Sequence, residues 1–318
     1  MFDFGRLVLN ETKTPARQPV VITATPGWGY EGVFAGLGYR SRHVPLRARD
    51  GYQPRWREFQ RLLMGEDDVK LVIINAQHNP TAANWSESAV REIIRSSVAA
   101  GAAILLDDAY FAVHDPNVKP TSALRILLEE LSALPPETRP IWLAVRSLGK
   151  QFHCNGWGIG AITGHPATVD RLVNQVRFER TFVNAVPLQY AMAAWLQDPA
   201  SDLYLEQMRS EYYRKRCAVA DYLADNLAYP PRAYYRGECT AFLRFEVPKR
   251  FSQLGAEDFR ADCFRSTGVM LSLDSSPEQV SKAGMASKAP CVRIFLGPSL
   301  NHLLEGLDRL QQAGFQYQ

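Results

Sequence analysis

Residues 102–110 read AAILLDDAY, an apolar run that ends in two aspartates and a tyrosine. The run has no polar alternation, which is typical of a strand that helices cover on both faces. Further runs of this kind lie within the first 190 residues, at 20–23, 71–75, 141–145 and 159–163. The helical stretches between them supply the crossovers of a parallel sheet. We therefore predict a three-layer α/β/α domain with a mostly parallel sheet.

The pattern changes beyond residue 200. Apolar residues from Leu205 to Leu227 recur at helical steps and predict a long helix that ends at Pro230. A smaller α+β unit is expected after it, with strands at 242–247 and 291–297 and helices at 256–268 and around 303–310. We place the boundary near residue 195, which gives a large domain of residues 1–195 and a small domain of residues 196–318.

The composition is that of a globular protein, with 46% hydrophobic and 22% charged residues. The net charge of +3 is too small to imply a nucleic-acid partner by itself. Seven arginines between Arg40 and Arg61 could form an anion- or RNA-binding face. Because Asp50 and Glu58 lie among them, a solvated or subunit-contact surface is favoured, and we expect no nucleic-acid partner.

Neither a membrane span nor an export signal is expected. The longest near-apolar run, residues 98–106, is about half of the ~20 residues that a spanning helix needs. The N-terminus has no basic segment and no cleavage site, so we expect a cytoplasmic protein. The five cysteines include no CxxC pair, which favours reduced thiols and no metal site.

Four polar clusters follow predicted strands: TPGWGY at 25–30, NAQHNPT at 75–81, DDAY at 107–110 and RSLGKQF at 146–152. Open α/β sheets bind ligands beyond the carboxyl ends of their strands. A partly desolvated lysine such as Lys150 loses its proton more readily and can condense with an aldehyde. An aspartate is the natural partner of a protonated pyridine nitrogen.

The ordered set PGW, HNPT, DDAY, SLGK and GWGIG, with a late VRIF, resembles fold-type-I pyridoxal-phosphate-dependent aminotransferases of class I/II. The resemblance covers nearly the whole chain. It implies that fold for the large domain, pyridoxal 5'-phosphate as cofactor, and an amino acid and a keto acid as substrates. It also implies a homodimer with the active site near the interface.

The resemblance gives two residues central roles. Lys150 matches the lysine that forms a Schiff base with the cofactor and then moves the proton between the substrate Cα and the cofactor C4′. Asp107 matches the carboxylate that keeps the pyridine nitrogen protonated. Since adjacent side chains of a strand point to opposite faces, Asp108 is expected to face elsewhere. The alternatives are a surface lysine and a turn-capping aspartate.

Three residues match groups around the cofactor ring. Tyr110 and Asn79 match the phenol and amide that hydrogen-bond its 3′-oxygen, and Trp28 matches the aromatic residue stacked on its face. A core tyrosine, a turn at Asn79-Pro80 and a buried core tryptophan are the alternatives.

Arg293, within VRIF, matches the arginine that binds the substrate α-carboxylate through its planar fork. The alternative is a surface ion pair. Ser147, three residues before Lys150, matches a hydroxyl donor to the cofactor phosphate, or it caps a helix or turn.

The phosphate site departs from the family pattern. The family usually has an arginine eight residues after the lysine, where this chain has Gly158. It also has a glycine-rich phosphate loop some thirty residues ahead of the stacking aromatic, and only 27 residues precede Trp28 here. Four residues are candidate substitutes: His153, Arg146, Arg171 and Arg177.

The sequence therefore predicts an enzyme that acts on an α-amino acid, most simply an aminotransferase. A lyase, a decarboxylase or an oxidase would use the same residues, because one fold serves several reactions. The missing phosphate anchors leave a second alternative: a non-catalytic or incomplete relative, or a protein whose phosphate site is completed by another chain.

Overall fold

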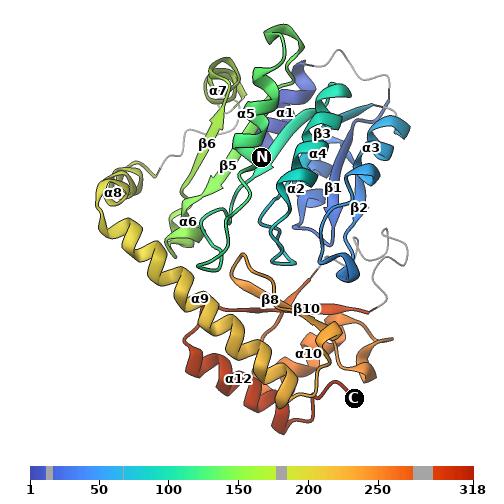
Figure 1. Cartoon of the computed structure of the whole chain (residues 1–318), viewed down its shortest axis with the longest axis vertical. Helices are drawn as coiled ribbons and strands as arrows, with labels where there is room; N and C mark the ends of the chain where they lie inside the picture. Colours follow the sequence, from blue (N-terminus) through green and yellow to red (C-terminus); the bar gives the residue numbers. More distant parts are fainter. Residues whose placement is uncertain (12–16, 67, 177–184, 275–288) are drawn as a thin grey trace.

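A six-stranded sheet forms the centre of the larger part of the molecule (Figure 1). The computed structural model describes residues 1–11, 17–66, 68–176, 185–274 and 289–318. The strand order is β2-β1-β3-β4-β5-β6, and every neighbouring pair is parallel except β5 and β6, which are antiparallel. The strands are β1 (Val20–Thr25), β2 (Arg40–Pro45), β3 (Val69–Ile74), β4 (Ala103–Asp107), β5 (Trp142–Ser147) and β6 (Gly160–Gly164).

Helices cover both faces of this sheet, which confirms the predicted layers. Alternate side chains of β1 enter different cores: Val20 and Ile22 pack with α3, α4 and α5, whereas Val21 packs with α1 and α2. The covering helices are α1 (Phe2–Glu11), α2 (Tyr30–Phe34), α3 (Trp56–Gly65), α4 (Glu87–Ala99) and α5 (Ala123–Ser132).

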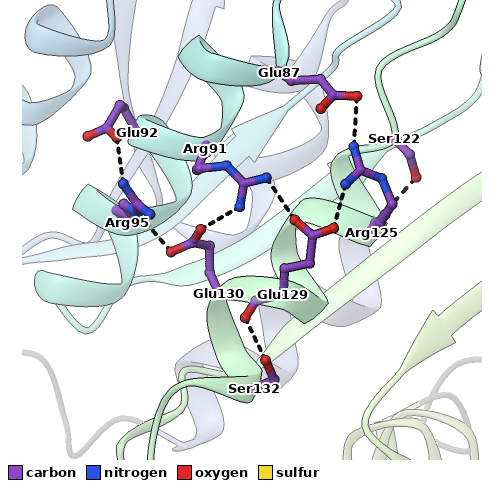
Figure 2. Close-up of polar contacts among 9 residues, drawn as sticks. All are labelled: Glu87, Arg91, Glu92, Arg95, Ser122, Arg125, Glu129, Glu130 and Ser132. Carbon is purple, nitrogen blue, oxygen red and sulfur yellow. Dashed lines mark hydrogen bonds and ion pairs between the residues drawn. The ribbon is translucent and has the colours of Figure 1, made fainter.

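An ion-pair network joins the outer surfaces of α4 and α5 (Figure 2). Arg91 contacts Glu130 at 2.6 Å and Glu129 at 2.7 Å, and Arg95 contacts Glu130 at 2.8 Å. Single exposed pairs stabilise a fold by only ~0–1 kcal/mol. The network therefore adds to the apolar packing beneath these helices and does not replace it.

A second, antiparallel sheet lies below the first in Figure 1, with strand order β7-β8-β10-β9. The helix α9 runs from the side of the first sheet to the second, where it packs with the C-terminal helix α12. The elements of this part are α8 (Val186–Gln197), α9 (Ala200–Asp225), β7 (Tyr234–Tyr235), β8 (Phe242–Glu246), α10 (Ala256–Thr267), β9 (Ser272–Leu273), β10 (Cys291–Phe295) and α12 (Leu300–Gln312).

Several short elements connect the longer ones. Two are α-helical, α6 (Leu148–Gln151) and α7 (Pro166–Arg171), and η5 (Leu172–Val176) is a π-helix. The 3₁₀ turns are η1 (Ala35–Leu37), η2 (Ala48–Asp50), η3 (Pro136–Thr138), η4 (Asn155–Trp157), η6 (Pro231–Ala233) and η7 (Lys249–Phe251). Within the described ranges, no helix combines the length and the apolar character needed to cross a bilayer.

The arginine-rich stretch 40–61 contains a strand that the sequence reasoning missed. Strand β2 is the edge of the first sheet, and two of its arginines, Arg40 and Arg42, form ion pairs with Glu66 at 2.9 and 2.6 Å. An edge strand is half exposed and tolerates charged residues, so it lacks the apolar run that marks a central strand.

Candidate active site

The predicted polar clusters meet at one edge of the first sheet. Strands β1, β3, β4 and β5 all end there, and the antiparallel β6 begins there. The segments at this edge enclose a cavity of about 350 Å³, a size typical of small-molecule sites. Six of the seven predicted site residues line it: Trp28, Asn79, Asp107, Tyr110, Ser147 and Lys150. Of these residues, Trp28 and Lys150 lie farthest apart in the sequence, by 122 positions, and the fold brings both to the same cavity.

Asp107 is the last residue of β4 and is buried. The hydroxyl of Tyr30 donates to its Oδ2 at 2.6 Å, and the backbone N–H of Ala109 donates to its Oδ1 at 3.2 Å. Burial raises the pKa of Asp107, whereas these hydrogen bonds and the positive charge of Lys150 lower it. Burial outweighs these opposing effects, so the pKa of Asp107 lies above its ordinary value, and the two donors limit that rise.

Asp108 is also buried but does not line the cavity. Burial raises its pKa to about 6, and the positive charge of Arg146 opposes that shift. Within the acidic pair, only Asp107 faces the cavity, as expected for adjacent residues at the end of a strand.

Lys150 lies on α6, the short helix that follows β5 directly. Its Nζ is 5.0 Å from the centre of the Tyr110 ring. Desolvation lowers the pKa of Lys150, the charge of Asp107 opposes this, and the charge of Arg293 lowers it further. More of the amine is therefore neutral, and so nucleophilic, than in a lysine exposed to water.

Arg293, the seventh predicted site residue, lies on β10 of the second sheet and is not part of the cavity lining. Its Nη1 donates to Oδ1 of Asn79 at 2.6 Å, and its Nε donates to the carbonyl of Leu273 at 3.0 Å. The backbone N–H of Asn79 donates to Oδ1 of Asn75 at 2.8 Å, and Nδ2 of Asn75 donates to the carbonyl of Asp107 at 2.6 Å. A series of hydrogen bonds through Asn79 and Asn75 thus connects Arg293 on the second sheet to the backbone carbonyl of Asp107 on the first.

Trp28 is 41% exposed and lies at the cavity, which argues against a core position. Its ring makes an edge contact with Tyr30, with ring centres 5.3 Å apart. Tyr110 is both buried and in the cavity lining. Ser147 precedes α6 as its N-cap, but its hydroxyl makes no capping hydrogen bond, so it is not held by the helix end.

Residues 7–254 match the family model described as aminotransferase class I and II, which is more than half of the chain. The chain belongs to the class I and II aminotransferase family. Members of this family are pyridoxal-phosphate-dependent.

The aminotransferases of known activity match part of the chain. A 4-dedimethylamino-4-oxo-anhydrotetracycline transaminase of Streptomyces rimosus is 33% identical over 156 residues, which is 49% of this chain and 40% of that protein. Methionine aminotransferase of Escherichia coli is 27% identical over 162 residues, 51% of this chain and 38% of that protein. The chain therefore matches less than half the length of these relatives.

The fold is that of solved aminotransferases. Aspartate aminotransferase from Thermus thermophilus with maleate superposes with a TM-score of 0.78 at 18% identity, covering 98% of this chain and 72% of that one. At this identity the likeness concerns the fold. About a quarter of the solved aminotransferase chain has no counterpart here.

The residues present fit the ring of the family's cofactor. A half-buried lysine, a buried carboxylate held by two donors and an aromatic ring open to the cavity are the groups that a pyridine aldehyde requires. Among the described residues, no group of three or more His, Cys, Asp or Glu side chains is placed to hold a metal ion.

The phosphate side differs from the family pattern. Gly158 has φ of 63°, in the left-handed region, and no atom lies within 4 Å of where a Cβ would be. An arginine at this position would have space but would adopt a backbone that costs roughly 1–2 kcal/mol for a residue with a Cβ. The chain therefore departs from the family pattern at this position in its backbone conformation as well as in lacking the arginine side chain.

Of the four candidate substitutes, Arg146 lines the cavity, with its guanidinium 4.4 Å from the centre of the Phe111 ring. His153 is held at both ring nitrogens by hydroxyls of α9, at 2.7 Å from Tyr212 and 2.6 Å from Tyr204. Arg171 forms an ion pair with Glu11. Arg177 lies outside the described residues.

Two residues of the site were missed from the sequence. Tyr30 stands two positions after Trp28 in the quoted TPGWGY, yet nothing in one sequence shows that it contacts a residue 77 positions away. Asn75 ends the second predicted strand run, where an amide is a plausible ligand, but its bonding to both Asn79 and Asp107 depends on the register of β3 and β4.

Proposed function

We propose that this chain acts as a pyridoxal-phosphate-dependent aminotransferase on an α-amino acid. One observation carries the proposal: Lys150 and Asp107 line the same cavity, the lysine with a lowered pKa and the aspartate held by two donors. Family membership supports the same activity.

When bound, pyridoxal phosphate supplies an aldehyde that condenses with amines and a ring that withdraws electrons from the substrate α-carbon. Asp107 would hold the ring nitrogen in its protonated form. Lys150 Nζ would take the proton from the α-carbon and return it at the cofactor C4′. A neutral amine is needed for the first of these transfers, which agrees with the desolvation of Lys150.

The other cavity residues would hold and orient the two molecules. Trp28 would cover one face of the ring and exclude water, while Tyr110 and Asn79 would hydrogen-bond the 3′-oxygen. Ser147 would donate to the phosphate, and Arg146, which also lines the cavity, would add positive charge there.

Arg293 would select an α-carboxylate. It uses two of its five N–H groups in the bonds to Asn79 and Leu273. These bonds fix the plane of the guanidinium beside Asn79, a residue of the cavity wall. A fixed plane favours a two-point contact with a carboxylate over a simple charge attraction.

We further propose a cytoplasmic homodimer and a domain boundary near residue 195. The boundary is supported by the separate cores of the two sheets, although α8 extends across it to Gln197. The partners would be an amino acid and a keto acid, with no nucleic acid and no membrane.

The test is a half-reaction. Purified protein loaded with pyridoxal phosphate is mixed with single L-amino acids, and the visible spectrum and the keto acid formed are followed. Keto acid formed in amounts equal to enzyme sites, followed by recovery of the starting spectrum and formation of a new amino acid when a second keto acid is added, supports transfer. Ammonia release, carbon dioxide release or dioxygen uptake in its place would indicate a lyase, a decarboxylase or an oxidase, and no product with any amino acid would indicate a non-catalytic relative.

A further inference from the structure

The turn that follows Lys150 has an unusual backbone conformation. Helix α6 is short, and His153, just beyond its end, has φ of 52°, in the left-handed region. This conformation costs roughly 1–2 kcal/mol for a residue with a β-carbon. The backbone N–H of Cys154 donates to the carbonyl of Gly149 at 2.9 Å, so His153 and Lys150 lie in one closed turn. Strain of this kind persists only where surrounding contacts compensate for it.

The compensating contacts come from helix α9. The imidazole Nε2 of His153 lies 2.7 Å from the hydroxyl of Tyr212, and its Nδ1 lies 2.6 Å from the hydroxyl of Tyr204. The two tyrosines occupy positions i and i+8 of the helix, which fall on one stripe of its surface. Burial and the positive charge of Lys215 lower the pKa of His153, so the ring is neutral near pH 7. A neutral ring has one donor and one acceptor nitrogen, and a tyrosine hydroxyl can bond to either.

The same helix is attached to the second sheet one turn further along. Arg216 of α9 is fully buried, and its guanidinium donates to the carbonyl of Thr240 at 2.7 Å and to that of Phe242 at 2.8 Å. Phe242 begins β8, which pairs with β10, the strand that carries Arg293. Helix α9 is therefore fixed to the sheet from which Arg293 extends.

Helix α9 thus connects the two groups on which the proposed reaction depends (Figure 1). Lys150 lies on α6, beside the first sheet, and Arg293 lies on the second. A substrate bound at Arg293 has to present its α-carbon to the Nζ of Lys150. A misplacement of about 1 Å between such groups can slow a reaction on the order of a hundredfold.

We propose that His153 is a positioning residue, which ties the turn of Lys150 to α9 and so holds the Lys150 amine at a fixed place relative to Arg293. His153 does not line the cavity, so this role differs from that of a phosphate ligand. The catalytic consequence rests on the proposed aminotransferase function. The placement of the amine does not, and it can be measured without any substrate.

Apolar contacts also hold α6. Leu148 packs with Met192 of α8 and with Ile159, and Phe152 lies beside them. Such packing is non-directional, whereas hydrogen bonds have preferred distances and angles. The two tyrosine hydroxyls therefore set the orientation of the turn, and the test removes these hydroxyls while leaving the apolar packing intact.

The apparent pKa of Lys150 reports the placement of its amine. Competitive labelling of the cofactor-free full chain with trace acetic anhydride, followed by mass spectrometry of the Lys150 peptide, measures it across a pH series. Asp107 of β4 and Arg293 of β10 are the charged groups that act on this amine, and the ring of Tyr110 lies 5.0 Å from it. None of these three is changed in the variants.

Tyr212→Phe removes one hydroxyl and keeps the ring. The turn should loosen and the Lys150 amine should gain water, so the apparent pKa should rise by about 0.5–1. Tyr204→Phe should have a smaller effect because Tyr204 is less buried, and the double variant should have the largest. Tyr222→Phe is the matched control: it lies on the same helix, its hydroxyl contacts Gln311 at 2.8 Å, and it should leave the pKa unchanged.

Substitutions of His153 separate the side chain from the backbone. Glycine and asparagine both tolerate a left-handed conformation, so neither should disturb the turn itself. His153→Gly should match the double tyrosine variant, whereas His153→Asn, which can still bond to one hydroxyl, should recover part of the parent behaviour. In enzyme loaded with pyridoxal phosphate, Tyr212→Phe should lower kcat about tenfold and change KM less than about threefold, since Arg293 is intact.

Three results would overturn the proposal: an unchanged Lys150 pKa in the double tyrosine variant, parent behaviour in His153→Gly, or an equal shift in Tyr222→Phe. A parent that forms no product with any amino acid would overturn the proposed function instead. The Lys150 pKa would still decide whether His153 positions the amine.

Discussion

The two sides of the cavity are built differently. Beside β3 and β4, buried groups are joined by short hydrogen bonds, with Tyr30 on Asp107 at 2.6 Å and Asn75 on the carbonyl of Asp107 at 2.6 Å. Beside β6, the wall consists of Gly158, Ile159 and Gly160, and the strand is exposed. The side that would receive the cofactor ring is therefore preorganised within the chain. On the side that would receive the phosphate, the proposed ligands are Ser147 and Arg146 of β5, and residues 158–160 add no charged side chain.

Replacing Asp107 on the preorganised side should have the largest effect. Asp107→Asn keeps the shape but cannot sustain a protonated ring nitrogen, so the amino-transfer half-reaction should slow by a factor on the order of 10²–10³. Stopped-flow absorbance measures the rate. Asp225→Asn, at the exposed end of α9, is the control. A rate within threefold of the parent would contradict the role proposed for Asp107.

Arg293 tests the link between the two sheets. Arg293→Lys keeps the positive charge but loses the planar fork, and should lower kcat/KM for an α-amino acid by about 10–100-fold. The dissociation constant of the cofactor should change little. Arg236→Lys, away from the cavity lining, should leave both constants unchanged. Equal losses in cofactor affinity and kcat/KM would show that Arg293 is mainly structural.

Tyr30 tests how strongly a hydrogen bond opposes the effect of burial on the pKa of Asp107. Tyr30→Phe removes the hydroxyl donor to Oδ2, so the pKa of Asp107 should rise further, and cofactor affinity should fall about tenfold. A pH titration of the carboxyl ¹³C signal of Asp107, in protein free of cofactor, measures the pKa of this residue directly. Tyr39→Phe removes a buried hydroxyl that donates to the carbonyl of Gly5, and it should not move the signal. An unchanged Asp107 titration in Tyr30→Phe would rule out this role.

Asp108 should have the smallest effect, on stability alone. Its folded pKa of about 6 lies above the ordinary value of 3.8, so the folded state binds this proton more tightly than the unfolded chain does. The stabilising contribution is complete below pH 4 and is lost as the pH rises through 6. Asp108→Asn should therefore raise the free energy of unfolding by about 1 kcal/mol at pH 7.5, and not at pH 3.5. Denaturant melts at both pH values measure this, and an equal gain at both would contradict the assigned titration.

The central strands, the strand-end motifs and the uncharged edge strand β6 were predictable from the sequence, whereas the polar edge strand β2 was not. The runs around Leu105 and Ile73 are apolar because both faces of their strands are buried, and a single sequence carries that signal. Strand β2 is polar because it lies at an edge, so its arginines resembled a surface patch. The fold class follows from the buried strands alone, and so it was predicted in spite of the missing edge.

The candidate site likewise contains residues that could be predicted from the sequence and residues that could not. Residues within the quoted motifs, such as Asp107 and Lys150, were predicted because those motifs resemble the family's and because the chemistry uses these residue types after strands. Tyr30 and Asn75 act through contacts that register and tertiary packing create, which spacing in one sequence does not encode. Trp28 could be separated from a core tryptophan only by its 41% exposure.

The central claim is that Lys150 holds the cofactor in the cavity at the carboxyl edge of the first sheet. Protein mixed with pyridoxal phosphate is reduced with borohydride, digested and examined by mass spectrometry. The account predicts one labelled lysine, Lys150, with the label absent from Lys150→Ala and retained in Lys215→Ala, which changes a buried lysine of α9. A label spread over other lysines, or a Lys150→Ala protein labelled as strongly as the parent, would contradict it.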